Sequence, residues 1–138
     1  MEQTLRITGS RPQRFVGRHL AMASGWNNAV SRWYEFNLYQ SGAGEIVCDV
    51  RLFHKSSDNA DLYRVSRHGD WRSAVTWLES YNTARDLVCD VGVDDESLSA
   101  AEISLRGIAI RQCMLELKTQ YQTTLGNLLY ELKLDLHD

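Results

Sequence analysis

The chain has 138 residues and a mass of 15.8 kDa, which predicts a single domain over 1–138 with its own hydrophobic core. Apolar residues make up 43% and charged residues 24%, a balance that excludes an extended disordered chain. No apolar run approaches the roughly 20 residues of a membrane span, and the start lacks a secretory signal, so we expect a cytoplasmic protein without a membrane partner.

The net charge of −3 is unevenly distributed along the chain. Residues 1–70 carry nine basic and seven acidic side chains, whereas residues 71–138 carry six basic and eleven acidic ones. Arg11, Arg14 and Arg18 lie in the basic N-terminal part. Such arginines attract nucleic acid or an acidic protein surface, but solvated loops and strand edges carry them as well.

The first half of the chain predicts antiparallel strands. Alternating or aromatic-rich runs occupy 4–8, 14–24, 32–40, 45–55 and 62–66. Glycine, asparagine and serine cluster between several of them and predict turns. In the second run Val16, Leu20 and Met22 share one side and are expected to be its apolar face. We predict a β-meander of four to five strands over 1–66.

The two central runs predict which side of the sheet is buried. Tyr34, Phe36 and Leu38 lie on one side of their strand, and positions 46, 48, 50 and 52 form a purely apolar side of the next. The opposite side mixes aromatic and charged residues, among them Trp33, Tyr39, Arg51 and Phe53. We therefore expect the first side to be core and the second to be a candidate contact surface.

Two short helices are predicted over 70–92. Asp70 is placed as an N-cap, and the apolar spacing from Trp71 to Tyr81 is helical. The segment 83–92 predicts a second short helix that ends at Gly92.

A long C-terminal helix is predicted over 99–134, where Ser99 and Glu102 fit a capping box. A continuous helix would be roughly 50 Å long, whereas a compact domain of this size is about 30–35 Å across. We therefore expect the helix to extend past the sheet and pair with a second copy. The alternatives are a break at Gly126 with both halves folded back, or a helix that covers the sheet of a monomer. The predicted dimer seam follows steps of four and three through Ile103, Gly107, Ile110, Met114, Leu117, Tyr121, Leu125, Leu128 and Leu132.

Signatures of catalysis and of metal binding are scarce. The three cysteines include no closely spaced pair and predict reduced thiols, and no phosphate-binding glycine loop precedes a helix. A site built from Cys48, His54 and His68 conflicts with the core-facing positions of the first two residues. We expect no catalytic residue, no metal and no cofactor, and thus no enzyme.

Nucleic acid is the alternative partner. Trp33, Tyr39 and Phe53 beside Arg51 combine groups that stack bases with a group that neutralises phosphate. Acidic residues on the same side oppose this, and the aromatic side chains are equally suited to packing under a helix or a partner chain.

Three segments, "FVGRHLAMAS", "RWYEFNLYQSGAGEIV" and "LYRVSRHGDWRSAVTWL", resemble a loose family of small bacterial proteins of plasmids, prophages and integrative elements. The resemblance covers about 15–92, with Ser41 in place of the usual threonine and Ile46 in place of an aromatic residue. It implies a mobile-element context, in which small acidic proteins bind host or rival machinery. The matching positions are Gly17, Leu20, Ala21, Arg32, Trp33, Glu35, Leu38, Tyr39, Gly44 and Val47.

Together these observations predict an α+β domain that acts as a non-enzymatic interaction protein. It is expected to be a homodimer and to bind another protein or a nucleoprotein complex, for example as an accessory subunit or inhibitor of a defence system. The alternative is a nucleic-acid-binding protein. The predicted interaction face comprises Trp33, Tyr39, Arg51 and Phe53 with the basic residues Arg11, Arg14 and Arg18.

Overall fold

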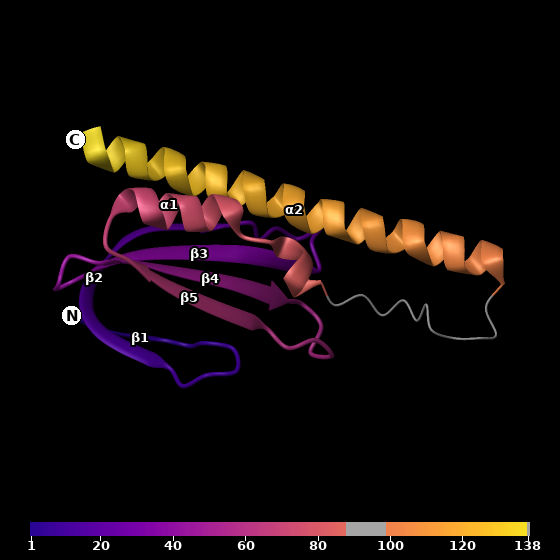
Figure 1. Cartoon of the computed structure of the whole chain (residues 1–138), viewed down its shortest axis with the longest axis horizontal. Helices are drawn as coiled ribbons and strands as arrows, with labels where there is room; N and C mark the ends of the chain where they lie inside the picture. The colour runs from indigo at the N-terminus through magenta and orange to yellow at the C-terminus, as the bar shows by residue number, and fades with distance from the viewer. Residues whose placement is uncertain (88–98, 138) are drawn as a thin grey trace.

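Five strands form one antiparallel sheet, and their order in the sheet follows their order in the sequence. The computed structural model describes residues 1–87 and 99–137, and side chains of the last helix as far as residue 133. The predicted α+β class and the predicted meander are confirmed (Figure 1). The strands are β1 (Glu2–Leu5), β2 (Gln13–Ser24), β3 (Arg32–Ser41), β4 (Ile46–His54) and β5 (Leu62–His68).

The helical elements follow the sheet in the sequence. Helix α1 (Trp71–Ser80) begins at Asp70, whose Oδ1 accepts a hydrogen bond from the Ser73 N–H at 2.7 Å, as expected for an N-cap. A 3₁₀ turn, η1 (Thr83–Asp86), comes next, and the long helix α2 (Ala100–His137) completes the described chain.

The prediction of a second short helix over 83–92 requires correction, because the described part of this segment forms only η1. The carboxylate of Asp86 is tied to the sheet by Arg64, whose Nη2 donates to Oδ1 at 3.2 Å. This contact attaches the end of η1 to the sheet. Beyond Leu87 the predicted helix, including its end at Gly92, lies outside the described residues.

A β-bulge in β2 changes which of its side chains face the helices. The register with β3 shifts between His19 and Ala21, so Leu20 is an extra residue that reverses the alternation. The apolar side predicted for this strand is therefore split between the two faces of the sheet. Val16 and Met22 are 64% and 46% exposed, whereas Ala21 is buried in the core.

One side of the sheet packs against both helices and forms the main core (Figure 1). The predicted burial of Tyr34, Phe36 and Leu38 is confirmed, since none of them is more than 1% exposed. The Tyr121 ring of α2 contacts two of these side chains, with centroid distances of 5.1 Å to Tyr34 and 5.0 Å to Phe36. Helix α2 contributes Leu117, Tyr121, Leu125, Leu128 and Leu132 to this core, and α1 contributes Ala74 and Leu78.

Gln120 of α2 is hydrogen-bonded to the start of β3. Its Oε1 accepts from the Tyr34 N–H at 2.8 Å, and its Nε2 donates to the Arg32 carbonyl at 3.0 Å. Strand β2 ends at Ser24, opposite Glu35, so the residues of β3 before this point lack a strand partner on that side. The helix therefore satisfies backbone groups that the sheet leaves open.

The other side of the sheet curls until the segment after β1 meets β5. The Thr8 N–H donates to the Tyr63 carbonyl at 2.8 Å, and the Tyr63 N–H donates to the Thr8 hydroxyl at 2.7 Å. The curl encloses a second, smaller core between the first strands and the last. It consists of Leu5, Phe15, Tyr39 and Val47, with Val65 packed against them.

Helix α2 is continuous over 38 residues and therefore about 57 Å long. Gly126 is exposed and does not interrupt it. The buried residues of α2 begin at Leu117. The first part of the helix, residues 100–116, extends beyond the edge of the sheet (Figure 1, orange), and we call it the projecting segment.

A matched pair of substitutions tests how α2 is attached. Leu128 is fully buried, so Leu128→Ala should lower the free energy of unfolding by about 2–5 kcal/mol. Tyr130 lies two positions away and is 65% exposed, so Tyr130→Ala should change it by less than about 0.5 kcal/mol. Urea unfolding followed by circular dichroism measures both values. Equal effects would contradict the packing of this half of α2 on the sheet.

Candidate interaction surface

The residues of the predicted interaction face lie on different surfaces of the molecule. Trp33 and Phe53 contact each other on the curled side of the sheet, with ring centroids 5.8 Å apart, and both are half-buried. Tyr39 lies on the same side but is only 7% exposed. The rings of Phe15 and His19 pack against its edge at 5.5 and 5.1 Å, so Tyr39 is not available to a partner.

The three basic residues predicted to join these aromatic side chains lie elsewhere. Arg18 points to the helix-facing side of β2, where its Nη2 donates to Gln40 Oε1 at 3.1 Å. Arg14 shares this side because it lies four residues earlier in the same strand, before the bulge. Arg11 lies in the exposed connection that precedes β2. The structure therefore does not bring these arginines together with Trp33 and Phe53 on one face.

Arg51 does lie beside the aromatic pair, but two carboxylates offset its charge. Its Nε donates to Asp49 Oδ2 at 2.7 Å, and its Nη1 lies 3.7 Å from Glu35 Oε2. Its guanidinium also lies 5.9 Å from the centre of the Tyr63 ring. The positive charge that Arg51 presents to a polyanion is therefore offset by the buried Asp49 and the partly exposed Glu35.

Asp49 is the most unusual member of this cluster, because its side chain is fully buried. One oxygen binds Arg51, while Oδ1 has no hydrogen-bond donor among the described residues. Burial raises the pKa of Asp49 to about 6, although Arg51 opposes the shift, and the nearby Glu35 adds to it. Burial and the nearby Asp49 also raise the pKa of Tyr39.

A line of polar contacts connects this cluster across three strands. The Asn37 amide donates to Glu35 Oε2 at 3.3 Å, and Asn37 Oδ1 lies 3.0 Å from His19 Nε2. These side chains satisfy one another's hydrogen-bonding groups in the region between the second core and the Trp33–Phe53 pair. Cys48, on the opposite side of β4, is buried, and burial raises the pKa of its thiol to about 12. The cysteine therefore stays protonated and is a poor nucleophile.

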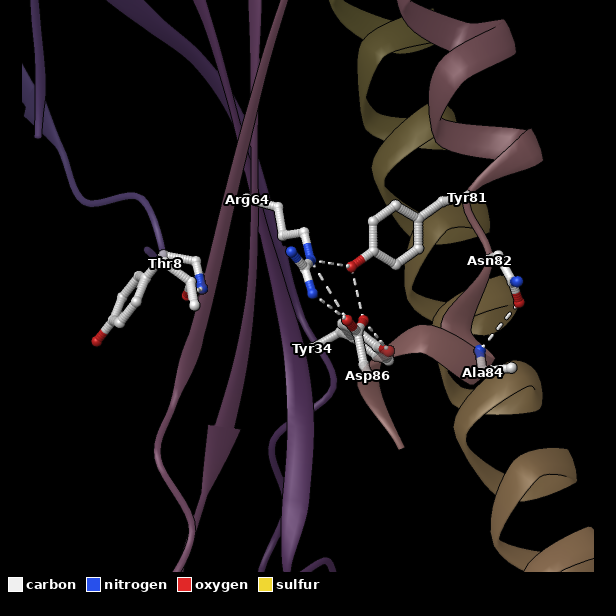
Figure 2. Close-up of polar contacts among 8 residues, drawn as sticks. Thr8, Tyr34, Arg64, Tyr81, Asn82, Ala84 and Asp86 are labelled. Carbon is white, nitrogen blue, oxygen red and sulfur yellow. Dashed lines mark hydrogen bonds and ion pairs between the residues drawn. The ribbon is translucent and has the colours of Figure 1, made fainter. Parts of the chain in front are cut away.

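A second buried polar cluster joins the sheet to η1, and sequence reasoning missed it (Figure 2). Asp86 is 1% exposed, and its Oδ2 accepts hydrogen bonds from the hydroxyls of Tyr34 at 2.8 Å and Tyr81 at 2.6 Å. Its Oδ1 pairs with Arg64 from β5, which also donates to the Tyr81 hydroxyl at 3.1 Å. No local sequence pattern predicts this cluster, because its members come from four separate segments of the chain.

This cluster is structural in character. Burial, reinforced by Asp86, raises the pKa values of Tyr34 and Tyr81, so both phenols remain protonated donors. The Tyr121 hydroxyl adds a bond to the Leu78 carbonyl at 2.5 Å, which ties α2 to α1. All polar groups are engaged by one another and hold η1, the sheet and the helices together.

The histidines do not gather into a metal site within the described residues. His68 lies between two hydroxyls, with Nε2 2.7 Å from Ser66 and Nδ1 2.8 Å from Ser73. Burial lowers the pKa of His54, although the nearby Asp61 opposes the shift. No group of three or more potential ligands occurs in the part of the chain that the structure describes.

The predicted dimer seam is used in two different ways. Its second half, Leu117, Tyr121, Leu125, Leu128 and Leu132, is at most 6% exposed and packs on the chain's own sheet. These five residues are therefore not available to a second copy, which corrects that part of the prediction. The reason is that this half of the seam faces the apolar side of the sheet and packs against it. The first half remains accessible, with Ile103 43% and Met114 39% exposed and Gly107 and Ile110 half-buried.

A second apolar stripe on the projecting segment is more exposed than the predicted seam. Leu105, Ile108 and Leu115 are 66%, 55% and 64% exposed. Their spacing of three and seven residues places them on one side of the helix. The sequence contains this spacing, but the apolar repeat from Ile103 to Leu132 is longer and therefore the more prominent pattern.

Two open grooves flank Leu115 where α2 leaves the sheet. One, of about 610 Å³, is lined by the end of α1, η1 and α2 residues including Arg111, Met114 and Lys118. The other, of about 720 Å³, lies between α2 and residues 29–32 and includes Glu116. The grooves separate α2 from the rest of the domain at this point and leave Leu115 exposed between them.

Comparisons with known protein families, with curated proteins and with solved structures find no match to this chain. Neither of the two described α-helices has the length and hydropathy needed to cross a membrane.

The buried carboxylate of Asp49 predicts a pH-dependent stability. Its pKa is about 6 in the folded chain against an ordinary value of 3.8, so the folded state binds this proton more tightly than the unfolded state. The free energy of unfolding should therefore fall by about 3 kcal/mol as pH rises from about 4 to about 6. Urea unfolding between pH 3.5 and 7 measures this change. Asp49→Asn should remove most of it.

Asp58→Asn is the matched control, because Asp58 lies in an exposed loop. This variant should retain the pH dependence of the original chain. A profile that Asp49→Asn leaves unchanged would show that another group titrates in this range.

Proposed function

We propose that this chain is a non-catalytic protein-interaction module that binds a second copy of itself through the projecting segment of α2. The observation that carries this proposal is the gathering of five large apolar side chains with exposures of 39–66% on one segment held away from the sheet. Leu105, Ile108 and Leu115 share one side of the helix, and exposed apolar surface of this kind marks sites of protein association. The five residues are Ile103, Leu105, Ile108, Met114 and Leu115.

A second copy is the occupant that the sequence of the segment favours. An apolar ridge in a helix that repeats at three- and four-residue steps is matched best by another helix with the same spacing. The ridge of Leu105, Ile108 and Leu115 is exposed along one side of α2, so two copies can present it to each other. The mobile-element context implied by the resemblance, and a role as an accessory subunit or inhibitor of a defence complex, are the further part of this proposal.

The nucleic-acid alternative has less support. Arg51, the central cation of the proposed stacking surface, pairs with Asp49 and approaches Glu35. Tyr39 is buried, and Arg14 and Arg18 point to the other side of β2. An enzymatic role has less support still. Asp86 is engaged in structural contacts, Asp49 is buried away from any substrate, and burial keeps the Cys48 thiol protonated.

Light scattering at micromolar concentration tests the proposal. The original chain should have a mass of about twice 15.8 kDa. Leu105→Lys with Ile108→Lys should reduce it to the monomer mass, since charged side chains replace the ridge while both residues are too exposed to support the fold. Lysine also preserves the helix propensity of the segment.

The control replaces two comparably exposed apolar residues of β2, Val16→Lys with Met22→Lys. This variant should keep the mass of the original chain. A monomer mass for the original chain itself would exclude self-association.

A further inference from the structure

We infer that the second copy binds parallel and in register along the side of α2 that faces away from the sheet; this inference rests on the proposed function. The surface involved is the outer stripe, which we define as Ala101, Leu105, Ile108, Gln112, Leu115 and Thr119. It is a different side of the helix from the seam that the sequence predicted.

The outer stripe lies opposite the sheet. Leu115 and Leu117 are two positions apart, which separates them by about 200° around the helix axis. Leu117 is buried against the sheet and Leu115 is 64% exposed. Two copies joined along the outer stripe would place their sheets on the outside, so neither sheet obstructs the contact.

The outer stripe has the spacing of a coiled-coil seam. Its members alternate in steps of four and three, with Leu105 and Gln112 at successive a positions and Ile108 and Leu115 at successive d positions. Beyond Thr119 the same line continues with Gln122, Gly126, Leu129 and Lys133, and Leu129 packs against the chain's own core. The apolar contact is therefore confined to the projecting segment.

Charges beside the stripe distinguish the two possible directions of pairing. Arg111 occupies a g position and Glu116 the following e position. In a parallel pair a g residue meets the e residue five positions later in the other helix, so Arg111 meets the partner's Glu116, and symmetry repeats the contact. The structure leaves both side chains exposed, and no ion pair occupies either of them within the described residues.

The antiparallel arrangement brings like charges together instead. In that arrangement e residues meet e residues and g residues meet g residues. With Leu105 beside the partner's Leu115, Glu102 would approach the partner's Glu116, and the two copies of Arg111 would approach each other. Like charges across a helix pair are unfavourable, so the sequence of the segment favours the parallel direction.

Gln112 supplies a further reason for exact register. Two copies of this residue meet in one layer of the parallel pair, where each amide can bond the other. A single polar a residue of this kind sets register and oligomeric state at a cost in stability. A shift of one heptad would place each glutamine amide against leucine or threonine.

A charge-exchange experiment tests the direction of pairing. Arg111→Glu or Glu116→Arg alone replaces two attractive contacts by two repulsive ones, so the dissociation constant in 50 mM salt should rise on the order of tenfold. The double variant with both changes should recover the original value. Sedimentation equilibrium measures these constants, and Arg72→Glu on the exposed side of α1 is the control with the same change of charge.

Each outcome bears on the inference. Recovery in the double variant supports it. A dimer that Glu116→Arg strengthens would indicate antiparallel pairing, and a dimer that neither change affects would indicate another contact surface; both results overturn the inference but leave self-association standing. A chain that is monomeric at all concentrations overturns the inference and the proposed self-association together.

A disulfide provides an independent measurement. Gln112→Cys places one thiol of each copy in the same layer of the parallel pair, so mild oxidation should give a covalent dimer. The original chain, which already contains Cys48, Cys89 and Cys113, is the control and should form much less. A variant that stays monomeric on denaturing gels would contradict the proposed register.

Discussion

The packing of Tyr121 and its neighbours on the sheet is the interaction on which the rest of this structure depends. Its ring lies against Tyr34 and Phe36 and stacks on Tyr81 at 5.1 Å, and its hydroxyl binds the Leu78 carbonyl. One side chain of α2 therefore contacts β3, α1 and the residue that follows α1. Because the second half of α2 is fixed in this way, the direction in which its first half projects is fixed as well.

The two sides of the sheet differ in how their buried carboxylates are paired, although both sides carry aromatic residues. On the helix-facing side, the buried carboxylate of Asp86 accepts hydrogen bonds from Arg64 and two phenols. The curled side holds Asp49 with one oxygen unsatisfied, which makes ionisation of that residue costly. A partner that covered the curled side would have to compensate for this cost of burying Asp49. A partner can cover the exposed ridge on α2 without involving a buried charge.

Local patterns predicted those features that depend on local physics. Alternation in β3 identified the buried side. Ser99 caps the start of α2, since the Glu102 N–H donates to Ser99 Oγ at 3.2 Å. The errors arise where distant segments decide the outcome. The extra residue Leu20 reverses the side-chain alternation of β2. The curl that buries Tyr39 forms only when the first and last strands come together. The Asp86 cluster likewise exists only once four elements are assembled.

The same reasoning explains why the predicted seam was assigned to a dimer. A long apolar stripe shows that a helix needs a partner, but it does not show whether that partner is the chain's own sheet or another molecule. Here the sheet occupies the stripe from Leu117 onward, so only surface beyond it can serve a second copy. Helices in proteins owe most of their stability to tertiary packing, and the projecting segment continues a helix that is packed on the sheet. Its conformation is therefore largely established in the single chain, which would lower the entropic cost of the proposed pairing.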